Sequence, residues 1–96
     1  MKIYYNAIFE YATDGINVTF PDVSEAITCA YTKDEAINMA QSVLDLVLHK
    51  RKVSELPKPT EKEKISIESN MEVVSVSIVV NEKDGIIFGK DVKDLV

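Results

Sequence analysis

Carboxylates are the most numerous side chains in this 96-residue sequence that could do chemistry. The chain has 16 Asp and Glu residues, but only one histidine, His49, and one cysteine, Cys29. His49 lies next to the cations of residues 50–52, where capping a helix end is a more typical role than catalysis. One cysteine cannot form an internal disulfide or a Cys-cluster metal site. Because no Gly-rich phosphate loop and no convergent carboxylate spacing is present either, we expect no catalytic, metal or cofactor site.

The acidic residues are concentrated in the first half of the chain. Residues 1–49 contain seven Asp or Glu residues but only two cations, Lys2 and Lys33, whereas residues 50–96 carry nine of each sign. Nucleic-acid binding relies on Lys and Arg, so the first half should repel phosphate and attract a basic protein. The candidates for a partner-binding face are the carboxylates of Asp22, Glu25, Asp34 and Asp45. For each of them the alternative is a solvated surface charge without a partner.

Hydrophobic alternation predicts three strands before any helix. Residues 2–10 alternate between two faces, and Asp14-Gly15 is typical of a hairpin turn. Residues 16–20 form a second predicted strand, which Pro21 ends because proline has no N–H to give to a sheet ladder. Residues 26–31 are expected to form a short third strand. Three strands joined by short links indicate an antiparallel meander.

A helix is predicted to begin at Thr32. Thr32 and Glu35 have the spacing of a capping box, in which each side chain bonds a backbone N–H that has no partner within the helix. Apolar residues then recur every three or four positions, which predicts one buried stripe. The stripe consists of Ala36, Ile37, Ala40, Val43, Leu44, Val47 and Leu48. Cations gather after it, and Pro57 ends the helical pattern.

The rest of the chain supplies one further predicted strand and a tail. Residues 60–70 are polar and predict a loop, in which Ile65 and Ile67 mark a candidate short strand, and residues 73–80 alternate as the fourth strand. The order β-β-β-α-β predicts an α+β two-layer sandwich, an antiparallel meander covered by one long helix. In the extension of residues 81–96, the run Ile86, Ile87 and Phe88 is either a fifth edge strand or a contact between protomers.

The order of these motifs resembles the HicB family of antitoxins. The matching residues are Tyr4, Tyr5, Ala7 and Phe9, then Asp14-Gly15, Phe20-Pro21-Asp22, Thr32, Glu35 and Ala36, and Leu56-Pro57-Lys58-Pro59-Thr60. Two turns depart from the family pattern: residues 24–26 are Ser-Glu-Ala instead of Pro-Gly-Cys, and residues 30–31 are Ala-Tyr instead of Gly-Asp. The resemblance covers residues 3–80. It implies a HicB-like domain over residues 1–80 with a partial RNase H-like fold, followed by the 81–96 extension.

The resemblance also implies a function and a partner. The chain would bind and neutralise a HicA-like toxin, a small basic ribonuclease, in a type II toxin–antitoxin system of the prokaryotic cytoplasm. A nuclease of this fold would need an acid within the first strand, where this chain has Asn6, with Glu10 only at the end. We therefore expect a protein that is not an enzyme and needs no cofactor.

The remaining expectations concern DNA, membranes and self-association. Family members commonly carry a C-terminal DNA-binding module, but the 16 residues after residue 80 are too few for a helix-turn-helix, so direct DNA binding is not expected. No apolar run predicts a membrane span or a signal peptide. A chain of this size is often helped by oligomerisation, here a dimer or tetramer. The alternative function is a non-enzymatic oligomeric regulatory module, or a transcriptional repressor that acts with a separate DNA-binding partner.

Overall fold

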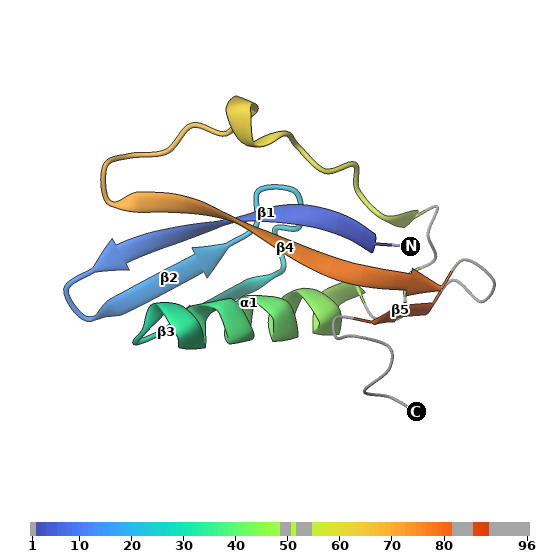
Figure 1. Ribbon diagram of the computed structural model, residues 1–96, viewed down its shortest axis with the longest axis horizontal. Helices are drawn as coiled ribbons and strands as arrows, with labels where there is room; N and C mark the ends of the chain where they lie inside the picture. Colours follow the sequence, from blue (N-terminus) through green and yellow to red (C-terminus); the bar gives the residue numbers. More distant parts are fainter. Residues whose placement is uncertain (1, 49–50, 52–54, 82–85, 89–96) are drawn as a thin grey trace.

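One helix covers one face of an antiparallel sheet in the computed structural model, which describes residues 2–48, 51, 55–81 and 86–88 (Figure 1). The predicted α+β class is confirmed. In chain order the elements are β1 (Lys2–Ala12), β2 (Gly15–Thr19), β3 (Ile27–Ala30), α1 (Lys33–Leu48), β4 (Met71–Asn81) and β5 (Ile86–Phe88). Within these ranges, no helix combines the length and apolar character that crossing a membrane requires.

The sheet has five strands in the order β3-β2-β1-β4-β5. β1, β2 and β3 form the predicted meander, and β4 returns on the other side of β1, with Tyr5 opposite Val76. β5 pairs antiparallel with the end of β4, with Phe88 opposite Val79, and so forms the edge of the sheet. Ile86, Ile87 and Phe88 thus belong to the same sheet, while residues 82–85 and 89–96 of the extension lie outside the described residues.

The core lies between this sheet and α1. The predicted alternation between two faces is confirmed, because Tyr5, Ala7 and Phe9 of β1 are fully buried and the inward residues of the neighbouring strands are at most 5% exposed. Those neighbours are Ile16 and Val18 in β2 and Val76 and Ile78 in β4. Such alternation follows from the two-residue period of a strand. The helix contributes Ala36, Ala40, Leu44 and Leu48, all fully buried.

The predicted helical stripe is wrong at one position. Ile37 is 40% exposed, whereas Val43 and Val47 are partly buried against the core. Residues four apart on a helix differ by about 40° in their direction around the axis. The row of Ala36, Ala40 and Leu44 therefore turns gradually around the helix, and the buried side at Ala36 is not the same as at Leu44. Ile37 lies on the flank of that row, where it is not covered. The two alanines have small side chains, and the helix packs on the sheet through them and the leucines.

The N-terminal end of α1 carries the predicted cap. The Glu35 N–H donates to Thr32 Oγ1 at 3.2 Å, and Glu35 Oε1 accepts the N–H of Tyr31 at 3.1 Å. In a standard capping box the Glu35 carboxylate would accept the N–H of the cap residue, Thr32. Here it accepts the N–H of Tyr31, the residue before the cap. Both bonds satisfy backbone groups that the helix itself leaves unpaired.

Residues 55–70 cross the end of the sheet and run along the side opposite α1 (Figure 1). The candidate strand at Ile65 and Ile67 is wrong, because neither residue is in a strand and residues 62–64 form a short 3₁₀ helix. The backbone bonds there are local: the Lys64 N–H donates to Glu61 and the Ile65 N–H to Lys62. Two alternating isoleucines in a polar stretch do not form a face long enough to hold a strand.

Removing buried volume from the helix should destabilise the fold. Leu44 is fully buried and Leu46 is 76% exposed on the same helix. Leu44→Ala should lower the free energy of unfolding by about 2–5 kcal/mol, because it removes buried methyl groups and leaves a cavity. Leu46→Ala should change it by less than about 0.5 kcal/mol. Urea unfolding of both variants measures this, and equal losses would contradict the packing described above.

Candidate functional site

Asp22, the first predicted binding residue, is engaged inside the molecule. Its Oδ2 accepts the N–H of Thr60 at 2.7 Å, and its Oδ1 accepts the Thr60 hydroxyl at 2.5 Å. The carbonyl of Thr60 accepts a bond from Asn6 Nδ2 at 3.0 Å, and the Tyr5 hydroxyl donates to the Pro57 carbonyl at 2.6 Å. Charge-assisted bonds of this kind are short and strong. Asp22 therefore holds the segment after the helix against the sheet.

Glu25 also has a partner within the chain. The guanidinium of Arg51 binds its carboxylate, and both side chains lie near the surface. This hydrogen bond holds the pKa of Glu25 below its ordinary value. Of the cations predicted at the helix end, Arg51 lies in the described part of the chain, and its N–H donates to the Leu48 carbonyl. Glu25 and Arg51 together link the β2–β3 loop to the end of α1.

Asp34 and Asp45 lie on α1 and not in the loop that carries Asp22. Asp34 is exposed in the first turn of the helix. Asp45 is eleven residues further on, which places it on nearly the same side of the helix, about 16 Å along the axis. Asp45 Oδ1 is buried and accepts no hydrogen bond within the described residues. The four predicted carboxylates thus do not form one face: two anchor a loop and two lie along one flank of α1.

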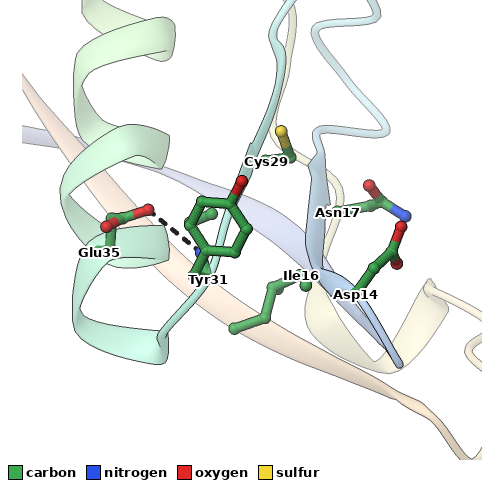
Figure 2. Close-up of a pocket in the computed structure, with 8 residues that line it drawn as sticks. Asp14, Ile16, Asn17, Cys29, Tyr31 and Glu35 are labelled. Atoms are coloured by element: carbon green, nitrogen blue, oxygen red, sulfur yellow. Dashed lines mark hydrogen bonds between the residues drawn. The ribbon is translucent and has the colours of Figure 1, made fainter.

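A hollow that the sequence analysis missed lies between the β1–β2 turn and the start of α1 (Figure 2). Its volume is about 250 Å³, and its lining residues are Asp14, Gly15, Ile16, Asn17, Cys29, Ala30, Tyr31 and Glu35. Figure 2 shows Glu35 on the helix side, Asp14 and Asn17 on the strand side, and the ring of Tyr31 between them. A second hollow of about 430 Å³ shares Asp14 and Tyr31. Tyr31 is 82% exposed, so it projects between the two.

Gly15 allows the turn to approach β3 closely enough to form this hollow. Its φ is +149°, a conformation that other residues rarely adopt, and a Cβ there would lie 2.8 Å from the Ala30 carbonyl oxygen. Ala30 directly precedes Tyr31, whose N–H is held by Glu35. The backbone of Tyr31 is therefore fixed from both sides while its ring is free to contact a partner.

Glu72 neutralises the cation beside the second hollow. It accepts the Tyr11 hydroxyl at 2.7 Å and Lys33 Nζ at 3.0 Å, and both donors line that hollow. The bond from Tyr11, followed by that from Lys33, lowers the pKa of Glu72, while the same contacts raise the pKa values of Tyr11 and Lys33. Because Lys33 is paired with Glu72, it forms no ion pair with the exposed carboxylates of Asp14 and Asp34 at this end of the molecule.

The first hollow has several polar groups that a bound molecule could contact. The first hollow offers carboxylates, an amide, a thiol and a projecting phenol. Across the described ranges, no group of three or more His, Cys, Asp or Glu residues could hold a metal ion. Of the predicted residues, only Asp34 lies near this end. The signals in the sequence were the Asp14-Gly15 turn and a tyrosine directly before the helix cap, and neither reveals that the two segments meet.

Comparison with known proteins assigns no family to the chain. No family model matches it, and no curated protein matches it with significant similarity.

Acid should remove the stability that Glu72 provides. A carboxyl whose pKa is lower in the folded state than in the unfolded state binds more protons when unfolded, so its contribution is present above the ordinary value of 4.5 and is lost as pH falls through the folded pKa. Glu72→Gln should therefore be less stable than the wild type at about pH 6, and the difference should shrink toward about pH 3. Urea unfolding across this range measures the difference, with Glu68→Gln as the control. A difference independent of pH would contradict this role.

Proposed function

We propose that this protein is a non-catalytic antitoxin that binds and neutralises a small basic ribonuclease toxin of the HicA type. The observation that carries the proposal is the acidic end of the molecule around Tyr31. Tyr31 is 82% exposed, Asp14 and Asp34 are exposed nearby, and the one cation of α1, Lys33, is paired with Glu72. We call Asp14, Tyr31 and Asp34 the acidic tyrosine end.

This surface has the composition of an interface for a basic protein. Tyrosines are enriched among the residues that contribute most to protein–protein affinity, and an acidic surface steers a basic partner toward it. Carboxylates can occupy the positions on an RNA-binding surface where phosphates would sit. The fixed backbone of Tyr31 reduces the ordering cost of binding, because only the ring has to be immobilised.

The proposal includes the HicB relationship and the partial RNase H-like fold that the sequence motifs imply. Asn6 supports its non-catalytic part. Asn6 lies in β1, within the strand where a metal-dependent nuclease of that fold would carry an acid, and both ends of its amide are used: Nδ2 donates to Thr60 and Oδ1 accepts the Ser75 hydroxyl at 2.8 Å. At this position the chain thus has a structural amide.

Co-expression with the basic chain encoded beside its gene tests the proposal. The two proteins should co-purify, and addition of this protein should stop RNA cleavage by the partner. Tyr31→Ala should weaken the complex by about tenfold or more, as expected for a central aromatic contact. Tyr4→Ala is the matched control, since Tyr4 is 56% exposed in β1 and should change affinity by less than about twofold. Titration calorimetry measures both, and a basic neighbour that neither binds nor is inhibited would overturn the proposal.

The alternative function, an oligomeric regulatory module, is favoured by one observation. Met39 and Leu46 are 40% and 76% exposed, and a spacing of seven residues places them on one flank of α1. A second copy could cover this flank. If it does, sedimentation should show an oligomer that Leu46→Lys converts to a monomer, whereas Ile27→Lys, which changes an exposed residue of β3, should have no effect. A monomeric wild-type protein would contradict this alternative.

A further inference from the structure

The outer edge of β4 has backbone groups that no described residue pairs with. β1 bonds one side of β4 along nine residue pairs, whereas β5 pairs only with Val79, Val80 and Asn81 on the other side. In an antiparallel strand successive residues direct their N–H and C=O groups to opposite sides. Between Met71 and Ser77, the backbone N–H and C=O groups of every second residue therefore point away from β1.

A hydrogen bond from α1 shows which residues these are. Gln41 Nε2 donates to the Ser77 carbonyl at 2.7 Å, so the backbone groups of Ser77 point away from β1. Counting back by two, Val73 and Ser75 also point outward. Gln41 thus occupies at Ser77 the place that a neighbouring strand would take, whereas no described strand pairs with Val73 and Ser75 on this side.

The flank of α1 beside this edge is acidic. Lys33 binds Glu72 and Gln41 binds Ser77, so α1 runs along β4 in the same direction. Helical periodicity places Asp34, Asn38 and Asp45 on the same flank as Gln41. Asp34 is exposed, and Asp45 Oδ1 is buried and accepts no hydrogen bond within the described residues. Lys33 is the one cation of α1 and is already paired with Glu72, so the helix itself adds no unpaired cation to this flank.

We propose that the edge of β4 at Val73 and Ser75 binds an extended basic segment of a partner protein as an added strand. The backbone groups of Val73 and Ser75 would supply the main-chain bonds, as in other complexes in which a peptide extends a sheet. The side chains of the segment that face α1 would meet Asp34 and Asn38, so lysine or arginine is favoured at alternate positions. Charge complementarity thus selects a basic segment and not an acidic one.

This edge adjoins the acidic tyrosine end, because Lys33 both binds Glu72 of β4 and lines the hollow beside Tyr31. A partner bound at Tyr31 could therefore extend a strand along β4. The inference adds a binding mode to the proposed function. Only the identity of the natural partner depends on that proposed function.

A capped peptide of alternating lysine and valine tests the inference on the full chain. In a nuclear magnetic resonance titration at low salt it should bind and slow hydrogen exchange of the Val73 and Ser75 amides, and a peptide of alternating glutamate and valine should not. Ser75→Pro removes an outward N–H and should weaken binding by about tenfold or more. Ser75→Ala keeps that N–H while losing the side-chain bond to Asn6, and should change binding by less than about twofold.

A second pair of variants tests the acidic flank without touching the sheet. Asn38→Lys and Leu46→Lys each add one cation to α1, and residue 46 is more than two turns away from residue 38. Asn38→Lys should weaken binding of the basic peptide by about two- to fivefold and Leu46→Lys by less than that. If the Ser75→Pro variant fails to fold, the comparison of Asn38→Lys with Leu46→Lys tests the inference instead.

Three results would overturn the inference: no peptide binding, binding without protection of Val73 and Ser75, or equal effects of the two lysine variants. Pairing of two copies through this edge, seen as dimerisation that Ser75→Pro abolishes, would also overturn it. Each of these leaves the toxin co-purification result standing. Conversely, failure of the toxin experiment would leave a positive peptide result intact, so the two proposals fail separately.

Discussion

The position of β1 between β2 and β4 is the constraint on which the rest of the structure depends. β1 forms hydrogen bonds on both sides, so its inward residues, Tyr5, Ala7 and Phe9, lie at the centre of the core. Because β4 must pair with β1 and not with β3, the chain after α1 has to cross the end of the sheet and run back along its other side. That path is held by Asp22 and Asn6, which both bind Thr60.

This path also determines which carboxylates are free. Asp22 is needed to hold the returning segment, and Glu25 pairs with Arg51 at the end of the helix. The carboxylates of Asp14 and Asp34 lie at the opposite end of α1, where the β1–β2 turn approaches the helix start. The excess of acid in the first half of the sequence thus leaves two exposed carboxylates at one end, while Asp22 and Glu25 are bonded within the chain at the other end.

The local elements could be predicted from the sequence because their causes are local. Strand alternation identified the inward residues of β1, β2 and β4, and the spacing of Thr32 and Glu35 identified the start of the helix. The candidate strand at Ile65 and Ile67 and the burial of Ile37 were wrong, since each depends on what the segment packs against. The candidate site was predicted least well: composition indicated acidic residues, but not that Asp22 would be bonded to Thr60 or that Tyr31 would project between two hollows.

The sequence by itself determined the order of the elements, the buried face of each strand, the cap of the helix and the excess of acid in the first half. These properties depend on residues within a few positions of one another. The tertiary structure decided which acids are paired, where Tyr31 lies and which edge of β4 the described strands leave unpaired. Those properties depend on contacts between residues far apart in the chain, such as Asp22 with Thr60 and Gln41 with Ser77, which no local pattern encodes.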